Sequence, residues 1–175
     1  GLPDLENLLV KAGKLSKVGK SFGVLKLKLT DREYDFSLPR QEWKIGPGHS
    51  GFKVRSLTKM AYPSAALRRD FTFNAINMNA RGNLEDYFKG QNDLKSQQVR
   101  FIGDVEERIQ EDYLRIIRYF RFLGLFEIPN LIDGYEEILY KYLPQVRIHI
   151  SNDRIRTELL KMLKNKFKLN SIVDS

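Results

Sequence analysis

The sequence predicts an α+β protein in which a mixed or antiparallel sheet with flanking helices is followed by an all-helical region. Apolar and polar residues alternate between residues 24 and 38, which is the period-two pattern of an antiparallel hairpin. From residue 104 onward, apolar residues recur at spacings of three and four, as they do in amphipathic helices. The change of pattern falls near Gly103, so the sequence predicts two domains, residues 1–103 and 104–175.

The first domain should begin with a short helix over residues 2–11, where three leucines form an apolar face. Two strands should follow, over residues 18–29 and 33–38, and pair as a hairpin. Asp35 stands in the middle of the second strand, where Asp is uncommon. The Asp35 carboxylate is therefore expected either on a solvated face or in a functional site.

The rest of the first domain contains short elements between loops. Residues 39–63 have the composition of a loop, and the glycines at 46–51 either let the backbone approach a ligand or belong to a plain surface loop. The following segments predict a helix, a hairpin of two strands, a short helix and a short strand, over residues 64–75, 76–80 with 83–87, 90–97 and 99–102.

The second domain should consist of three helices. The first covers residues 105–126, the second covers 133–142 and should end before Pro144, and the third should begin at Ser151, a residue suited to a helix N-cap.

The helix over residues 105–126 carries a polar stripe beside its apolar stripe. Asp112 and Arg115 are three residues apart, which makes them neighbours on a helix surface. A carboxylate accepts hydrogen bonds and a guanidinium donates them, so the two together suit the mixed edge of a nucleic-acid base, with Tyr119 or Phe122 as a stacking surface. The alternative is a solvated ion pair that stabilises the helix by only about 0.2–0.5 kcal/mol.

The composition restricts the kinds of partner and site. The net charge is +8 and the sequence pI is about 9.6, which with 8 Tyr and 11 Phe fits either an RNA partner or simply a basic protein. The chain has no cysteine, and only His49 and His149 could offer imidazole ligands, which excludes a typical zinc cluster. No apolar run reaches the roughly 20 residues of a membrane span and no signal peptide is visible, so we expect a cytoplasmic protein without a membrane partner.

Four ordered motifs resemble those of one enzyme family. Residues 68–75 read Arg-Arg-Asp-Phe-Thr-Phe-Asn-Ala, and residues 111–115 read Glu-Asp-Tyr-Leu-Arg. Residues 151–160 resemble a Ser-x-Glu-Arg-Ile-x-x-Glu-Leu segment, with Asp153 in the place of its first Glu. Between them, Asp86, Gly90 and Asp93 fall at family-like positions. The chain resembles class II tRNA nucleotidyltransferases and bacterial poly(A) polymerases over nearly its whole length.

This resemblance implies a nucleotidyltransferase head followed by a helical neck. The implied enzyme adds C and/or A to tRNA or other RNA 3′ ends from CTP and ATP, and releases pyrophosphate. The resemblance also implies that nucleotide is bound by residues that read the base, hold ribose and phosphate, or line the triphosphate, with a supporting acidic position on a strand. Asp112 and Arg115 would read the base, and Arg69, Asp70 and Asn74 would hold ribose and phosphate. Arg118 and Arg121 would line the triphosphate. Asp35 would be the supporting acidic residue and is the catalytic candidate.

One departure from the family pattern concerns the metal. The family holds its catalytic Mg²⁺ with an Asp-x-Asp pair, and no Asp-x-Asp occurs in these 175 residues. We expect the Mg²⁺ ligands in a segment before Gly1, no metal ligand within the given sequence, and no activity from this polypeptide alone. The alternatives are a bacterial poly(A) polymerase and a non-catalytic RNA-binding fragment of the same fold. The motifs predict neither the RNA-binding residues nor the oligomeric state.

Overall fold

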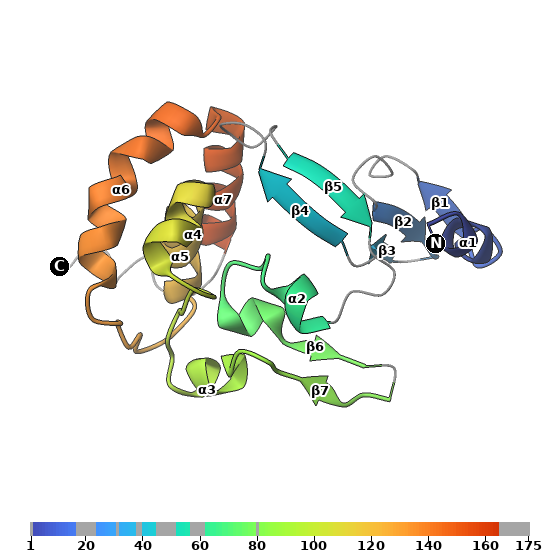
Figure 1. Cartoon of the computed structure of the whole chain (residues 1–175), viewed down its shortest axis with the longest axis horizontal. Coiled ribbons are helices and arrows are strands. Elements are labelled where there is room, and N and C mark those ends of the chain that lie inside the picture. The colour runs from blue at the N-terminus through green and yellow to red at the C-terminus, as the bar shows by residue number, and fades with distance from the viewer. Residues whose placement is uncertain are drawn as a thin grey trace. The chain divides into compact units, whose positions relative to one another are not determined.

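The protein forms two compact units, Gly1–Arg68 and Arg69–Ser175, in a computed structural model (Figure 1). Residues 69–103 share a hydrophobic core with the helices that follow them, and this shared core places the boundary between units at Arg68. The predicted domain division near Gly103 stays a prediction. The residues that the structure describes are 2–16, 24–30, 32–37, 40–44, 52–56, 62–79 and 81–164.

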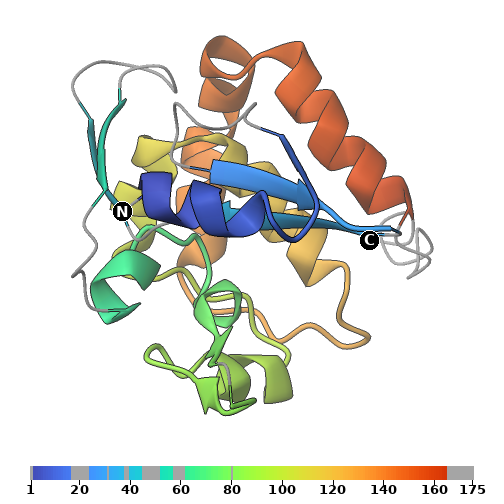
Figure 2. The ribbon, with the colours of Figure 1, turned by 90° about the vertical axis from the view of Figure 1, so that its right-hand side faces the viewer.

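The first unit contains a helix on a three-stranded antiparallel sheet of order β1-β2-β3. Leucines of the helix pack against Leu25 and Leu27 of the central strand, so the helix covers one face of the sheet (Figure 2). The predicted helix and hairpin are confirmed, with Leu27 opposite Tyr34, but residues 18–23 of the first predicted strand lie outside the described residues. The strand over residues 14–16 was not predicted. The elements are α1 (Leu2–Leu9), β1 (Lys14–Ser16), β2 (Val24–Lys28) and β3 (Glu33–Ser37).

The prediction of a loop over residues 39–63 is partly wrong. Two strands lie within it, β4 (Arg40–Lys44) and β5 (Phe52–Ser56), and they pair antiparallel. In β4 only Trp43 is apolar, so this strand has no period-two pattern of its own, and its formation depends on pairing. In β5, Phe52 and Val54 alternate with Lys53 and Arg55, and the sequence prediction missed this alternation. The glycine-rich segment 46–51 lies outside the described residues.

The single helix predicted over residues 64–75 is also wrong. Helix α2 (Tyr62–Ala66) ends early, and a separate 3₁₀ turn, η2, covers Thr72–Ala75. The carboxylate of Asp70 accepts hydrogen bonds from the backbone N–H of Phe71 and the side-chain amide of Asn74. Such local side-chain bonds compete with helix formation and favour a turn.

The second hairpin and the short helix are confirmed, with shorter strands than predicted: β6 (Asn77–Met78), β7 (Leu84–Glu85) and α3 (Gly90–Lys95). The strand predicted over residues 99–102 is reduced to a single antiparallel bridge between Phe71 and Phe101.

Gly90 lies where α3 meets the backbone of η2. A Cβ atom at this position would stand 2.5 Å from the carbonyl oxygen of Thr72, and the Thr72 hydroxyl donates to Asp93 of α3 at 2.6 Å. We expect Gly90→Ala to lower the free energy of unfolding by about 1–3 kcal/mol, because backbone atoms must move apart. Urea unfolding followed by circular dichroism measures this change.

Gly124→Ala is the matched control for this prediction. Its Cβ would meet nothing closer than 3.5 Å, and Gly124 already has a right-handed conformation with φ −68°. Equal unfolding free energies for the two alanine variants would contradict the close approach of α3 to η2.

Four helices complete the second unit: α4 (Val105–Glu111), α5 (Leu114–Leu123), α6 (Tyr135–His149) and α7 (Asn152–Lys164). The continuous helix predicted over residues 105–126 is wrong, because the chain breaks between α4 and α5. Asp112 is extended there, with φ −155° and ψ 103°, and its carboxylate accepts from the N–H of Leu114 at 3.2 Å. An aspartate that bonds a following N–H starts a new helix rather than continuing the old one.

Helix α6 continues through Pro144, so its predicted end before this proline is wrong. A proline in a helix interior costs about 3 kcal/mol. Leu139 and Val146 are buried on either side of it, and their packing in the core holds the helix together across the proline. Helix α7 begins directly after Ser151, as predicted.

The core of the second unit joins α4, α5 and α6 to the segment that carries η2. Phe71 is fully buried in this core, and so, with at most 2% exposed surface each, are Val99, Ile109, Ile116 and Leu139. No helix among the described residues is long and apolar enough to cross a membrane.

Candidate nucleotide-binding site

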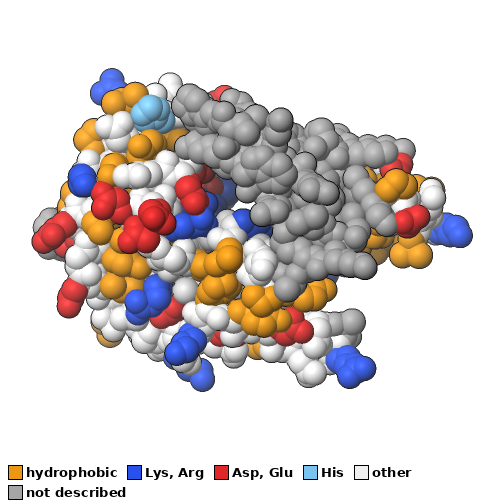
Figure 3. Space-filling model, viewed as in Figure 1, with side chains coloured by type: hydrophobic (Ala, Val, Ile, Leu, Met, Phe, Trp, Pro, Cys, Tyr) orange, Lys and Arg blue, Asp and Glu red, His pale blue; other side chains and the backbone are white. Residues whose placement is uncertain are grey.

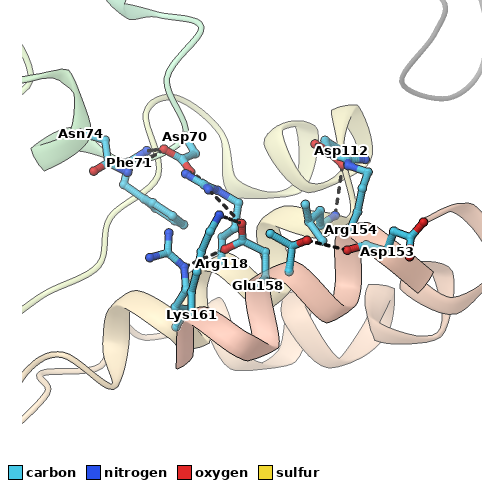
Figure 4. A network of polar contacts seen from close by, with 12 residues as sticks. Asp70, Phe71, Asn74, Asp112, Arg118, Asp153, Arg154, Glu158 and Lys161 are labelled. Carbon is cyan, nitrogen blue, oxygen red and sulfur yellow. Dashed lines mark hydrogen bonds and ion pairs between the residues drawn. The ribbon is translucent and has the colours of Figure 1, made fainter. Parts of the chain in front are cut away.

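The predicted residues Asp70 and Arg118 meet in a buried ion pair. Nε of Arg118 donates to Oδ2 of Asp70 at 2.6 Å, and the Asn74 amide donates to Oδ1 at 2.9 Å (Figure 4). Burial alone would raise the pKa of Asp70, but Arg118, Asn74 and the N–H of Phe71 hold the pKa of that carboxyl below its usual value. Three of the predicted nucleotide-binding residues therefore form one fixed cluster.

Glu158 of α7 joins this cluster and was not among the predicted site residues. Its side chain is 5% exposed and lies 3.6 Å from Arg118, and Lys161 donates to its Oε1 at 2.7 Å. The Nε of Arg121 lies 2.7 Å from Oε2, an ion-pair contact whose angle does not make a hydrogen bond. Burial would raise the pKa of Glu158, yet these three cations lower the pKa instead.

Asp112 and Arg115 are not paired with each other, because the break between α4 and α5 separates them. Instead, two nitrogens of Arg154 on α7 donate to the Asp112 carboxylate, at 2.8 and 3.3 Å (Figure 4). Both Arg154 and Glu158 lie in the motif-like segment 151–160, which was the signal that could have identified them. Residue spacing alone does not show which helices pack together.

Arg115 belongs to a second cluster with two residues of α4. Its Nη1 donates to the carboxylate of Glu111 at 2.5 Å and to the carbonyl oxygen of Arg108 at 2.6 Å. Arg108 shares the same carboxylate, and burial followed by the repulsion of Arg115 lowers the pKa of Arg108. Two guanidinium groups thus share one carboxylate, which leaves positive charge unbalanced here.

The two candidate stacking residues behave differently. Tyr119 is 3% exposed and lies in the core, where burial raises its pKa to about 12, so its predicted role as a stacking surface is wrong. Its ring stacks on Phe101 instead. Phe122 is half-buried, and the guanidinium of Arg121 lies 3.9 Å from its ring centroid, so Arg121 and Phe122 form one cation–π pair.

The remaining predicted residues are Arg69, which joins the second cluster through its backbone, and Asp35. Arg69 has an exposed side chain, and its carbonyl oxygen accepts from Arg108 at 2.6 Å. Asp35 belongs to the first unit, on an exposed position of β3, where Lys26 lies 3.2 Å from it. Its catalytic role stays a prediction.

The clusters of the second unit carry more positive than negative charge. Arg108, Arg115, Arg118, Arg121, Arg154 and Lys161 are paired with only Asp70, Glu111, Asp112 and Glu158. Acidic and basic side chains gather together over helices α4 and α5 (Figure 3). Such an excess of guanidinium groups suits a polyphosphate ligand. Among the described residues, no group of three metal-ligating side chains occurs.

Solved structures of nucleotide complexes resemble this fold. A Bacillus stearothermophilus CCA-adding enzyme in complex with CTP has a TM-score of 0.73 and 27% identity, over 88% of this chain and 36% of that chain. A CCA-adding enzyme in complex with ATP has a TM-score of 0.69 and 28% identity, over 92% of this chain and 35% of that chain.

Proteins of similar sequence are also named as CCA-adding enzymes or CCA tRNA nucleotidyltransferases. The mitochondrial CCA tRNA nucleotidyltransferase 1 of Danio rerio is 32% identical over 168 residues, and that of Homo sapiens is 36% identical over 148 residues. These matches cover 91% and 83% of this chain but only 37% and 33% of the relatives, so the chain spans about a third of their length.

The family model for the poly A polymerase head domain matches residues 5–100, more than half of the chain. The helices and small antiparallel sheets of this chain agree with the predicted α+β head. The chain therefore belongs to the family of class II CCA-adding enzymes and poly(A) polymerases.

Proposed function

We propose that this chain is the nucleotide-binding part of a tRNA nucleotidyltransferase that adds C and/or A to tRNA 3′ ends from CTP and ATP. The observation that carries the proposal is the break between α4 and α5, where a fixed acceptor, Asp112, and a fixed donor, Arg115, flank one turn. The names of the relatives, and the CTP, ATP and tRNA complexes of similar structures, support it.

The clusters leave hydrogen-bonding capacity for a nucleotide base. A carboxylate offers about four acceptor sites, and Asp112 uses its oxygens for Arg154 and the N–H of Leu114. A guanidinium offers five donors, and Arg115 bonds Arg108 and Glu111 through one nitrogen, Nη1. In this proposal Asp112 accepts from the base, and Arg115 donates to it.

The remaining predicted residues hold the sugar and the phosphates in this proposal. Asp70, positioned by Asn74, accepts from the ribose, and Arg69 approaches the phosphates. Arg118 and Arg121 neutralise the triphosphate as the RNA 3′ hydroxyl attacks the α-phosphate and pyrophosphate leaves. Fixed guanidinium groups suit this role because the charge on the leaving pyrophosphate grows during the transfer.

Mg²⁺ is the cofactor of this proposal, since divalent ions activate the attacking hydroxyl and neutralise the leaving group in such transfers. A head of residues 1–103 followed by a helical neck is part of the same proposal, and the family match over 5–100 supports it. Cytoplasm is the proposed compartment, although the vertebrate relatives carry mitochondrial names.

Replacing Arg115 tests the base-reading role. We expect Arg115→Ala in the full-length protein to reduce the preference between CTP and ATP by about 1–3 kcal/mol, which is about 5- to 150-fold in relative kcat/KM. The apparent affinity for triphosphate should change less, because Arg118 and Arg121 remain. Unchanged nucleotide preference in this variant would show that Arg115 does not read the base.

The product made on a tRNA without its 3′ end separates the proposed function from its alternatives. Addition of a short defined end supports a tRNA nucleotidyltransferase, whereas a long A tail supports a poly(A) polymerase, the enzyme after which the matching family model is named. Binding of RNA without any incorporation by the full-length protein supports the non-catalytic alternative.

A further inference from the structure

Tyr113 is the only residue between the extended Asp112 and the first residue of α5. Its backbone, with φ −60° and ψ −18°, returns the chain from the extended conformation to a helical one. A rotation at Tyr113 would therefore change the direction of the Asp112 carboxylate relative to Arg115. How the Tyr113 side chain is held thus determines the geometry of the break.

The ring of Tyr113 contacts two rings of α6. Its centroid lies 6.1 Å from that of Tyr142 at an interplanar angle of 28°, and 5.2 Å from that of His149 at 25°. Residues seven apart on a helix stand about 10.5 Å apart along its axis, so the ring of Tyr113 spans the two turns between them. Stacked rings at these separations attract each other beyond the effect of burial.

Polar contacts fix Tyr142 to α4, the helix before the break. Its hydroxyl donates to Oε1 of Glu106 at 2.6 Å and accepts from Nε2 of Gln110 at 2.5 Å. Lys141 donates to the same oxygen of Glu106 at 2.7 Å. Tyr142 therefore links α4 to the ring of Tyr113, the residue before α5.

His149, the last residue of α6, contacts the ring of Tyr113 as well. It is exposed, and its ring contacts Tyr113 and its Nε2 lies 3.1 Å from Gln145. Helix α7 begins three residues later and supplies Arg154, which grips Asp112. Residues near the junction of α6 and α7 thus contact both residues of the break. His149 stacks on Tyr113, and Arg154 forms an ion pair with Asp112.

We propose that Tyr142 and His149 are positioning residues that set nucleotide selection by holding the ring of Tyr113. This inference rests on the proposed function, because it assumes that Asp112 and Arg115 read the base. Neither ring touches the nucleotide in this arrangement. Their effect reaches the base through the backbone of Tyr113.

The test compares His149→Ala with His149→Phe in the full-length protein. For each variant, kcat/KM for CTP and for ATP is measured on one tRNA that lacks its 3′ end. Loss of folded protein lowers both values equally and leaves their ratio unchanged, so the ratio reports geometry. Tyr140→Ala is the matched control, because it removes a ring that is 59% exposed from the same helix.

We expect His149→Ala to move the CTP/ATP ratio about two- to tenfold toward one, the size expected for one lost ring pair. His149→Phe should keep the wild-type ratio, because it keeps a ring, and so should Tyr140→Ala. Tyr142→Phe keeps the ring but loses the hydrogen bonds to Glu106 and Gln110, and it should give an intermediate CTP/ATP ratio.

Two results would overturn the inference and leave the proposed function intact: an unchanged ratio in His149→Ala, or equal shifts in His149→Ala and His149→Phe. Failure of the wild-type full-length protein to incorporate either nucleotide would instead remove the proposed function, and the inference with it. A ratio that moves in His149→Ala and returns in His149→Phe supports the positioning role.

Discussion

Arg118→Ala is expected to lower the free energy of unfolding by about 3–5 kcal/mol, the cost of leaving a buried charge unpaired. The side chain of Asp70 is 9% exposed, and Arg118 forms an ion pair with it at 2.6 Å. Glu158 loses one of three cations and keeps Arg121 and Lys161. Most of the loss therefore arises at Asp70, and urea unfolding at neutral pH measures it.

Lowering the pH should reduce this loss. The folded-state pKa of Asp70 lies below its unfolded value, so in the wild type its contribution to stability is present above about pH 4 and disappears as the pH falls through the folded-state pKa. Without Arg118, only the bonds from Asn74 and Phe71 oppose the effect of burial, so the pKa of Asp70 is higher than in the wild type. The carboxyl then becomes protonated at a higher pH, and the penalty of the unpaired charge disappears. The difference between wild type and variant should narrow as the pH falls through 4.

Lys141→Ala is the matched control for Arg118→Ala. It also removes a cation from an ion pair, but both partners are exposed, so the expected change is below about 1 kcal/mol. If Arg118→Ala were no more destabilising than Lys141→Ala, the Asp70 pair would not be the buried contact described above.

Phe71→Ala should also lower the free energy of unfolding by about 3–5 kcal/mol, because it opens a cavity in the centre of the core. The Phe71 ring has no exposed surface and contacts the rings of Phe101 at 4.8 Å, Phe122 at 5.4 Å and Phe73 at 5.7 Å. Phe71 also adjoins Asp70, so nucleotide binding should weaken in the same variant. Chemical denaturation gives the first change, and nucleotide titration of the full-length protein gives the second.

Tyr140→Ala makes the same type of deletion at an exposed position, and its expected effect lies within about 0.5 kcal/mol. Phe71→Leu keeps most of the volume and should recover much of the stability. A Phe71→Ala variant as stable as Tyr140→Ala would disprove the central place of Phe71 in the core.

The amphipathic patterns of this chain predicted which segments form elements, but not where helices break. The hairpin of β2 and β3 follows from its alternation, and α7 begins where Ser151 predicts. The two helices that were predicted as continuous are both interrupted at an aspartate, Asp70 or Asp112, whose carboxylate accepts from a nearby backbone N–H. Periodicity does not detect these bonds, and local conflicts of this kind are most expected at functional sites.

The site itself could be predicted only as far as the motifs extend. Asp70, Asn74 and Arg118 were predicted, and the structure brings them together. Glu158 and Arg154 were not predicted, since their partners lie about 40 residues away and only tertiary packing brings them close. Strand β4 was missed because its pairing, rather than its own composition, determines its structure.

The division into two compact units has a spectroscopic consequence. Trp43, the single tryptophan of the chain, lies on β4 in the first unit, whereas six of the eight tyrosines lie in the second. Tryptophan emission therefore reports on the first unit, and tyrosine signals report mainly on the unit that holds the candidate site. Different midpoints for the two signals in one denaturation would show that the units unfold separately, and would locate the effect of each substitution.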